Sequence, residues 1–404
     1  MKKFLFALLI LSLIFPILSV VAQNETTCED GFRLFDHELL AGDPVCIPEN
    51  PQRILALEIS AIEASVFAGK ELVGTANWLH EEVPVLMPEL AFALEGIADT
   101  GYPANLEVAL EVAPDLILAV EGDIDLEAGS EIAPIVMPIA GLEYDWKTSM
   151  EFWSAVLGIE DMYADMIANY ETRIAEFQEA LGDADPEISI IGASSYGAYM
   201  WLVDTAPGVV LSDAGLSRPE SQNLSLEESL ERYDAERWIL LSEERYDLAD
   251  ADAIFVFTYA TTDPETLETE TAYMEAFKVD PIWNALSAVQ AGNVYYVGPY
   301  WWRAQTYLLA NKVLDDLFTN LTDSSANTPA LRVASAEETA SIECEVGLRG
   351  VVDAVGTSLC LPEQPERVVS LTDSDTDALV ALGVKAVGYS NGRGADTPPR
   401  YSLD

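Results

Sequence analysis

The chain has 404 residues, half of them hydrophobic, and 69 acidic residues against 20 basic ones give a formal net charge of −49. This length predicts two or three domains, or one large two-lobed domain with a substantial core. The negative charge argues against nucleic acid and anionic membranes as partners, because their phosphates would be repelled. The acidic residues are spread along the chain, so we interpret them as a solvated surface and not as a cation-binding site.

The first 22 residues have the pattern of a cleavable signal peptide. Two lysines follow Met1, an apolar run covers 4–21, and small residues precede Gln23. An uncleaved membrane anchor is the alternative, since the run is nearly long enough to span a bilayer. A lipoprotein signal would place a cysteine at the cleavage point, whereas Cys28 follows a polar segment. We therefore expect a periplasmic or extracellular protein that is not lipid-anchored.

The cysteines form two local pairs, Cys28 with Cys46 and Cys344 with Cys360. In an oxidising compartment each pair is expected to form a disulfide. Closing a loop of fewer than about twenty residues contributes roughly 3 kcal/mol to stability. A metal site that uses all four cysteines is the less favoured alternative, because zinc-binding cysteines usually lie only about two to four residues apart.

The two cysteine pairs belong to an internal repeat. "CEDGFR" and "CIPENPQR" in the first copy match "CEVGLR" and "CLPEQPER" in the second, and Gly74 matches Gly388. A repeat of this length indicates a duplicated domain and not a solenoid. The Ser-, Thr- and Ala-rich segment 322–343 is predicted to be a linker. We expect residues 344–404 to be the start of a second, truncated copy, with docking of this fragment on the first copy as the alternative.

The first copy is predicted to form two α/β lobes, because short apolar runs alternate with helical patterns. The expected strands of the first lobe are 53–58, 71–76, 115–120 and 134–139. Those of the second lobe are 187–193, 198–203, 238–242, 252–258 and 293–298, followed by a helix over 303–321. The expected units are an extension 28–46, an N-lobe 47–144, a single bridging helix 145–182 interrupted only at Gly158, and a C-lobe 186–321.

Four segments, in this order, carry a resemblance to one known family. They are "PQRILALEISAIEASVFAGKELVG", "GYPANLEVALEVAPDLILA", "LSEERYDLADADAIFVF" and "DPIWNALSAVQAGNVYYVGPYWW". Over residues 47–321 the chain resembles the periplasmic substrate-binding proteins of ABC importers for iron-siderophore complexes, cobalamin and haem. The resemblance implies two Rossmann-like α/β lobes bridged by one long helix. It also implies that a monomer captures a ferric siderophore or similar metal chelate between the lobes and delivers it to an ABC permease.

The resemblance leaves two alternatives open. The ligand could be cobalamin or haem, or the protein could sense its ligand without a transport role. In the family a glutamate on each lobe docks onto arginines of the permease, and the matching positions are Glu107 and Glu243, or its neighbour Glu244. Both are also explained as ordinary acids in the first turn of a helix, where the helix dipole favours them.

Aromatic and basic residues occur in the loops that should face the cleft between the lobes. Open α/β sheets bind ligands at the carboxyl ends of their strands, and aromatic rings suit a bulky, partly apolar chelate. The candidate ligand-binding residues are Trp78, Tyr102, Tyr196, Tyr199, Arg218, Trp301, Trp302 and Arg303. The two arginines would pair with anionic groups. Since only two are found, a hydroxamate, mixed or neutral complex is favoured over a catecholate.

An enzyme is not expected. "GASSYG" (192–197) only faintly resembles a nucleophile elbow, and His37 and His80 both precede it, whereas the hydrolase order places the histidine last. No phosphate-binding glycine pattern occurs. Two histidines do not suffice for direct capture of zinc or manganese. We therefore predict no catalytic residue, no metal-ligating residue and no cofactor, with an iron(III) chelate as the ligand.

Overall fold

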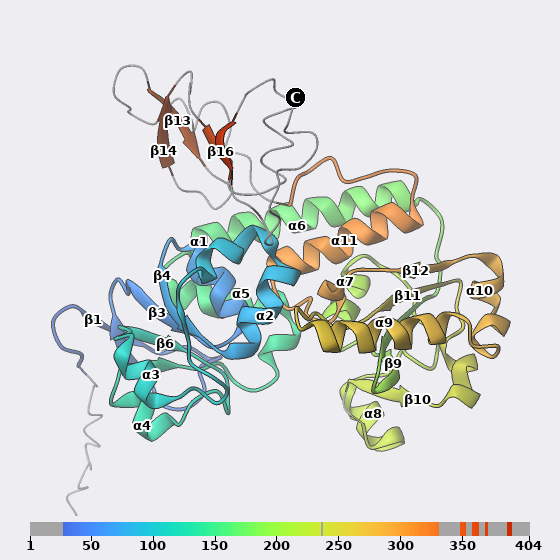
Figure 1. The fold of residues 1–404 in the computed structure, drawn as a ribbon, viewed down its shortest axis with the longest axis horizontal. Coiled ribbons are helices and arrows are strands. Elements are labelled where there is room, and N and C mark those ends of the chain that lie inside the picture. Colours follow the sequence, from blue (N-terminus) through green and yellow to red (C-terminus); the bar gives the residue numbers. More distant parts are fainter. Residues whose placement is uncertain are drawn as a thin grey trace, which may run out of the picture.

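The computed structural model describes residues 27–235 and 237–330, and four short strands between 348 and 389. The predicted signal peptide, most of the linker and most of the second copy lie outside the described residues. Figure 1 shows two α/β lobes, with helices α6 (Glu160–Leu181) and α11 (Tyr307–Leu321) running along one side of the pair. None of the helices in the described ranges is long and apolar enough to cross a membrane.

The N-lobe contains a five-stranded sheet in the order β5-β4-β3-β6-β7, with every neighbouring pair parallel. Four strands coincide with predicted ones: β3 (Arg53–Ala56), β4 (Glu71–Thr75), β6 (Leu116–Leu118) and β7 (Ile135–Val136). The fifth, β5 (Ala98–Asp99), is too short to give a sequence pattern. Because all five strands run in one direction, their carboxyl ends meet at one edge of the sheet.

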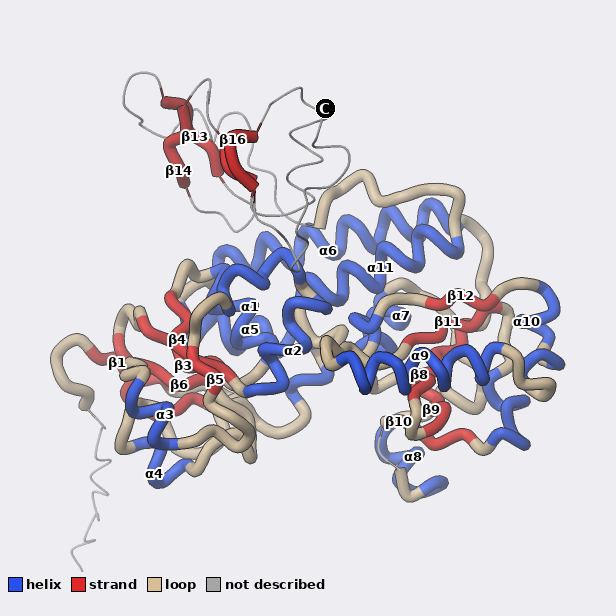
Figure 2. The backbone as a smooth tube through the Cα atoms, viewed as in Figure 1, coloured by secondary structure: helices blue, strands red, loops and turns tan. Residues whose placement is uncertain are grey.

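Helices pack around this sheet, as Figure 2 shows. They are α1 (Ile59–Phe67), α2 (Asn77–Leu86), η1 (Pro88–Leu94), α3 (Leu106–Glu111), α4 (Leu126–Ser130) and η2 (Leu142–Tyr144). Every residue of α1 is buried, because the helix lies between the sheet and α5 (Trp146–Leu157). The strand β3 and the helix α1 therefore form the centre of the lobe.

The C-lobe sheet has the order β10-β9-β8-β11-β12. Its strands are β8 (Ile188–Ser194), β9 (Gly197–Trp201), β10 (Trp238–Leu241), β11 (Ala253–Phe257) and β12 (Val294–Tyr296). The helices are α7 (Ala206–Asp213), α8 (Leu226–Tyr233), η3 (Glu243–Ala249), α9 (Pro264–Lys278), η4 (Trp283–Ala285), α10 (Ser287–Ala291) and η5 (Pro299–Trp301). Strands β8, β11 and β12 are parallel, whereas β9 pairs antiparallel with both of its neighbours. The two-lobed α/β fold is thus confirmed.

The bridge between the lobes is shorter than the single helix predicted over 145–182. Helix α5 ends at Gly158, which has a left-handed conformation with a φ of +71°, and α6 begins two residues later. Glycine adopts this conformation without the steric cost that other residues carry, so it ends the helix and lets the chain change direction. Helix α5 packs on the N-lobe, and only α6 extends along both lobes (Figure 1).

Buried contacts hold α6 against α11. The Arg173 side chain on α6 is only 2% exposed and donates hydrogen bonds to Asn311 and Asp315 on α11. The Phe177 and Phe318 rings meet edge to face, with their centroids 5.3 Å apart. These contacts combine a buried charge with apolar packing, so the two helices form one rigid unit.

A buried carboxylate joins the two lobes. Glu63 on α1 of the N-lobe accepts hydrogen bonds from the backbone amides of Tyr307 and Leu308, at 2.9 and 3.0 Å. These amides belong to the first turn of α11, where a helix has no partners of its own for its N–H groups. Burial raises the pKa of Glu63 from 4.5 to about 7, in spite of these hydrogen bonds. A side chain of the N-lobe thus provides the hydrogen-bond acceptors for the first turn of a C-lobe helix.

The N-terminal extension is a hairpin of β1 (Phe32–Phe35) and β2 (Val45–Pro48), closed by the predicted disulfide between Cys28 and Cys46. Arg33 donates hydrogen bonds to the carbonyls of Ala155 and Val156 at the end of α5, at 2.9 and 2.7 Å. The extension is therefore fastened to the N-lobe.

Four strands are described in the predicted second copy: β13 (Leu348–Val352), β14 (Ser358–Pro362), β15 (Val368–Ser370) and β16 (Ala386–Tyr389). Strands β13 and β14 pair antiparallel, and β15 and β16 pair parallel. Cys360 is disulfide-bonded, and Cys344 lies outside the described residues. The truncated second copy itself stays a prediction.

We expect the pKa of Glu63 to make stability depend on pH. The folded protein holds a proton on Glu63 up to about pH 7, whereas the unfolded chain releases it near pH 4.5. This contribution to stability is fully present below about pH 4.5 and is lost as the pH rises through 7. The free energy of unfolding of the wild type, minus that of Glu63→Gln, should fall by at most about 3 kcal/mol between pH 4.5 and 8. Urea unfolding of both proteins at several pH values measures this difference. A difference that stays constant between pH 4.5 and 8 would contradict the prediction.

Candidate ligand-binding site

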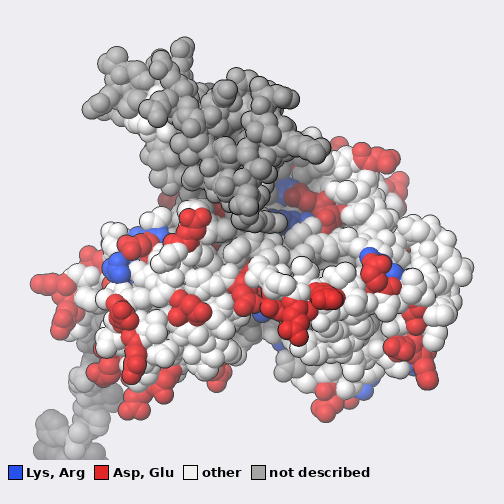
Figure 3. Space-filling view, viewed as in Figure 1, with Lys and Arg blue, Asp and Glu red and all other residues white. Residues whose placement is uncertain are grey.

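Figure 3 shows an indentation between the two lobes. Two pockets lie near the contact between the lobes, one lined mainly by the N-lobe and one by the C-lobe. The N-lobe pocket, of about 360 Å³, is lined among others by Glu58, Trp78, Tyr102, Asp123, Tyr144 and Arg303. The C-lobe pocket, of about 240 Å³, is lined by Tyr196, Tyr199, Trp201, Trp238, Tyr259 and Trp302, together with Ser194. The pockets adjoin, because the guanidinium group of Arg303 in the first lies 5.9 Å from the ring centroid of Trp302 in the second, and we call them together the cleft.

The chain reaches the cleft at the carboxyl ends of its parallel strands. Glu58 follows β3, and Asp123 follows β6. In the C-lobe, Tyr196 follows β8 and Tyr259 follows β11. This is the edge at which open α/β sheets bind their ligands.

The C-lobe pocket has a wall of packed aromatic rings. The Trp302 ring lies 4.9 Å from Tyr259 and 5.3 Å from Trp201, centroid to centroid. Trp201 also stacks on Trp238 at 5.5 Å. A Cβ atom at Gly192 would lie 2.6 Å from the indole nitrogen of Trp201, so glycine at this position lets Trp201 lie against strand β8. The wall presents a preformed apolar surface with polar edges, which suits stacking on a bulky ligand.

The turn between β8 and β9, which carries Tyr196, is held by a buried carboxylate. Glu270 on α9 is 3% exposed and accepts hydrogen bonds from the Ser195 amide at 2.9 Å and the Ser195 hydroxyl at 2.6 Å. Thr258 donates to the same carboxylate at 3.3 Å. Tyr196 itself is 69% exposed, so its ring is accessible from the cleft while its backbone is fixed.

Arginines cross between the lobes at the cleft. Arg303 of the C-lobe forms an ion pair with Glu82 on α2 of the N-lobe, with N–O distances of 2.9 and 3.3 Å. Its guanidinium group also lies over the Trp78 ring, 4.7 Å from the centroid. Arg237 of the C-lobe lies 3.8 Å from the centroid of the Tyr144 ring. The lobes therefore touch through charged and aromatic contacts on either side of the N-lobe pocket.

The N-lobe pocket has a carboxylate corner, formed by Glu58 and Asp123. Glu58 caps α1 and accepts hydrogen bonds from the amides of Ser60 and Ala61 at 2.8 and 3.0 Å, and from the Ser60 hydroxyl. Asp123 accepts one from the Val120 amide at 2.8 Å. Burial, and to a smaller extent the charge of Glu58, raises the pKa of Asp123 to about 7.

Six of the eight candidate ligand-binding residues line the cleft: Trp78, Tyr102, Tyr196, Tyr199, Trp302 and Arg303. Two do not, which corrects the prediction. Trp301 is fully buried, stacks on Phe255 at 4.8 Å and donates to Asp316 at 2.7 Å. Because Trp301 and Trp302 are consecutive in a tight helical turn, they point in different directions, and only Trp302 reaches the cleft.

Arg218 is the second correction. It is 8% exposed and donates hydrogen bonds to the Trp201 carbonyl at 2.5 Å and the Gln222 side chain at 2.6 Å, outside both pockets. Burial lowers its pKa to about 9.

The sequence analysis missed the carboxylate corner, Tyr144, Trp238 and Tyr259. Glu58 lies two residues after β3 and Asp123 lies in the loop after β6, and these positions could have indicated both residues if the sequence contained fewer other acidic residues.

The predicted docking residues lie away from the cleft. Glu107 is exposed in the first turn of α3, which Asn105 caps. Glu243 is exposed in the first turn of η3, and Ser242 makes no capping hydrogen bond there. Both carboxylates are therefore available to a partner.

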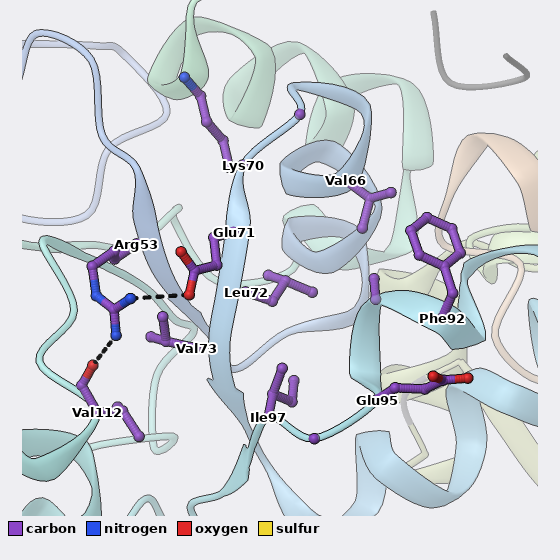
Figure 4. Close-up of a pocket in the computed structure, with 13 residues that line it drawn as sticks. Arg53, Val66, Lys70, Glu71, Leu72, Val73, Phe92, Glu95, Ile97 and Val112 are labelled. Carbon is purple, nitrogen blue, oxygen red and sulfur yellow. Dashed lines mark hydrogen bonds and ion pairs between the residues drawn. The ribbon is translucent and has the colours of Figure 1, made fainter. Parts of the chain in front are cut away.

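A larger pocket, of about 650 Å³, lies at the opposite edge of the N-lobe sheet (Figure 4). Arg53 and Glu71, at the amino ends of β3 and β4, form an ion pair there at 2.9 Å, and Phe92 lies across the pocket. Its position at the amino ends of the strands, with a single aromatic ring, does not suit the capture of a ligand between lobes.

In the described ranges, no group of three or more His, Cys, Asp or Glu residues could hold a metal ion.

The comparison with known proteins decides the family, because the periplasmic binding protein family matches residues 97–300. This chain belongs to the periplasmic binding protein family. It is similar to the probable siderophore-binding lipoprotein YfiY of Bacillus subtilis, with 26% identity over 79% of this chain and 98% of the relative. It is also similar to the achromobactin-binding periplasmic protein of Dickeya dadantii, with 26% identity over 66% of this chain and 85% of the relative.

Solved structures of this family have the same fold. Staphylococcus aureus SirA complexed with staphyloferrin B matches with a TM-score of 0.60 and 23% identity, over 72% of this chain and 98% of SirA. Bacillus subtilis FeuA complexed with ferri-bacillibactin matches with a TM-score of 0.56 and 20% identity, over 72% of this chain and 98% of FeuA. These relatives are binding proteins, and the family functions outside the cytoplasm.

Proposed function

We propose that this protein captures a ferric siderophore, or a similar metal chelate, between its two lobes and delivers it to an ABC permease. The observation that carries the proposal is the aromatic cleft at the carboxyl ends of both sheets. Its support is that this chain covers nearly the whole length of YfiY, a relative named a probable siderophore-binding lipoprotein. We further propose that it acts as a monomer without a cofactor or a catalytic residue of its own.

The cleft offers what a chelate of this kind requires. A siderophore encloses its metal in a bulky, partly apolar shell, and the rings of Trp78, Tyr102 and Trp302 can stack on such a shell and exclude water. Arg303 can donate to metal-bound oxygens, because guanidinium groups bind oxygen anions in a bidentate manner. Since Arg303 is already paired with Glu82, a ligand would compete for it or share it.

We expect binding to depend on the aromatic rings of both pockets. The purified protein should show quenching of its tryptophan fluorescence with at least one ferric siderophore from a set of hydroxamate, hydroxycarboxylate and catecholate complexes. Trp78→Ala and Trp302→Ala should each weaken this binding by roughly tenfold, the scale of one good contact. Phe92→Ala, in the pocket of Figure 4, is the control and should bind as the wild type does. Binding of cobalamin, haem, a sugar or a peptide in place of every ferric siderophore would refute the proposed ligand.

Docking to the permease should depend on Glu107 and Glu243. The double variant Glu107→Ala/Glu243→Ala should lose co-purification with the cognate permease while its ligand affinity stays unchanged, because both residues are exposed and lie outside the cleft. Exposed glutamates on other helices provide the matched control, Glu179→Ala/Glu268→Ala, which should still co-purify. Retention of the first double variant by the permease would argue against these docking residues.

We also propose that the protein is exported with a cleaved signal peptide and is not lipid-anchored. The first cysteine, Cys28, forms a disulfide with Cys46, so its sulfur is not available for a lipid. In this respect the chain would differ from its Bacillus subtilis relative, which is named a lipoprotein.

A further inference from the structure

The N-lobe pocket contains a buried carboxylate with incomplete hydrogen bonding. Asp123 is 3% exposed, and one of its oxygens accepts the Val120 amide at 2.8 Å. Among the described residues its other oxygen has no hydrogen-bond donor, and the side chain lines the pocket. This second oxygen is not among the fully buried side-chain atoms that lack a hydrogen-bond partner, so it borders the open pocket. A donor group on a bound ligand could therefore form a hydrogen bond with it.

Glu58 makes the same corner more negative. Its carboxylate is 5% exposed, and the first-turn amides of α1 hold it in place. A helix N-terminus favours a negative charge beside it. The burial of Asp123 and the charge of Glu58 together raise the pKa of Asp123 to about 7. The carboxylate corner therefore favours a positively charged group or a neutral donor over an anion.

Two arginines near this corner have contacts of their own. Both oxygens of Glu82 bind Arg303, and the Arg303 guanidinium lies over the Trp78 ring. Arg237 lies over the Tyr144 ring and donates to the Asp204 carbonyl at 3.1 Å. Each of these side chains is engaged elsewhere. The aromatic rings around the pocket are themselves suited to a cation, because the face of an aromatic ring attracts positive charge.

We propose that Asp123 and Glu58 form a subsite for a hydrogen-bond donor on the ligand, preferentially a protonated amine. The inference rests on the proposed function and specifies its substrate class: a ferric chelate that carries a free amine in addition to its iron-binding groups. The Asp123 carboxylate receives the ammonium group, and the neighbouring charge of Glu58 adds to the attraction.

A matched pair of ligands tests this subsite in the full chain. One is a linear ferric tris-hydroxamate with a free terminal amine, and the other is the same complex with that amine acetylated. The free amine should give binding at least about tenfold tighter, as expected for one charge-assisted hydrogen bond. In Asp123→Asn, which keeps the size of the side chain, most of this difference should disappear. Asp125→Asn, two residues away and exposed, is the control and should keep it.

Each other outcome overturns the subsite. Equal affinity for the two complexes, or an unchanged difference in Asp123→Asn, would show that the corner does not receive the amine. If neither hydroxamate binds but a trianionic ferric tris-catecholate does, the subsite is refuted and the proposed function stands. If no ferric chelate binds at all, the proposed function fails, and the subsite fails with it.

A second, independent observation concerns the strands near the end of the chain. In the N-terminal hairpin, Phe32 pairs with Pro48, and in the hairpin of β13 and β14, Leu348 pairs with Pro362. The sequence repeat aligns these same positions, "GFR" with "GLR" and "CIP" with "CLP". The two hairpins therefore have the same register.

The parallel strand pairs agree in greater detail. Both pairs shift register at the equivalent point, between Ile54 and Leu55 in the first copy and between Val368 and Val369 in the second. The first copy pairs Ile54 with Leu72 and Leu55 with Gly74, and the second pairs Val368 with Ala386 and Val369 with Gly388. A Cβ atom at Gly74 would lie within 3.3 Å of three neighbouring groups, so a glycine allows the close approach at this shift. The repeat places a glycine at the same point.

We infer that β13 to β16 are the hairpin and the first strand pair of a second binding module of the same family. A shared register and a shared irregularity follow from a common fold, whereas unrelated strands would have no reason to reproduce both.

Hydrogen exchange and disulfide mapping of the full chain test this module. Peptides that cover β13 and β14 should exchange at least about tenfold more slowly than an unstructured peptide, because paired amides are protected. Cys360 should be bonded to Cys344, as Cys46 is to Cys28. Cys360→Ser should reduce the protection of β13 and β14 and leave β1 and β2 unchanged. Exchange at the unstructured rate, or pairing of Cys360 with any other cysteine, would refute the module.

Discussion

The arrangement of the cleft depends on the buried hydrogen bonds between Glu63 and the start of α11. Helix α11 begins only a few residues after Trp302 and Arg303, so the position of its first turn determines where these side chains lie. Glu63 fixes that turn to α1, the most buried helix of the N-lobe. The buried contact of Glu63 therefore places the C-lobe loop with Trp302 and Arg303 against the N-lobe pocket. The Glu63 carboxylate is costly to bury in its charged form.

This junction also limits how the lobes can move. Helices α6 and α11 are joined through Arg173 and cannot separate without exposing a buried charge. Near the cleft, the contacts of Arg303 with Glu82 and of Arg237 with Tyr144 are more accessible and can exchange with a ligand. The structure thus combines a rigid side, formed by the two long helices, with an adjustable side at the pockets. Closure around a ligand should be a small bending movement, as expected for a helical bridge.

Much of the fold could be predicted, because the central strands β6, β8 and β11 are short apolar runs bounded by turn residues and are buried on both faces. The errors have local physical causes. The predicted bridging helix was too long although its interruption at Gly158 was noted, because helical spacing continues on both sides of this glycine and only the backbone conformation shows that the chain turns there. Arg218 was assigned to the cleft as an arginine in a loop expected to face it, but its hydrogen bonds to Trp201 and Gln222 depend on tertiary packing that no local pattern encodes.

The carboxylate corner shows how a common residue type acquires a specific role. Carboxylates are spread over the surface in Figure 3, where water and salt screen them and each contributes little. Asp123 and Glu58 differ from these only in burial, and burial removes the screening. Composition therefore could not distinguish them from the other acidic residues. Because the chain carries a formal net charge of −49, a cationic ligand would be attracted at long range by the protein as a whole and bound at short range by the corner. The acidity of the sequence would then favour both the approach and the selection of such a ligand.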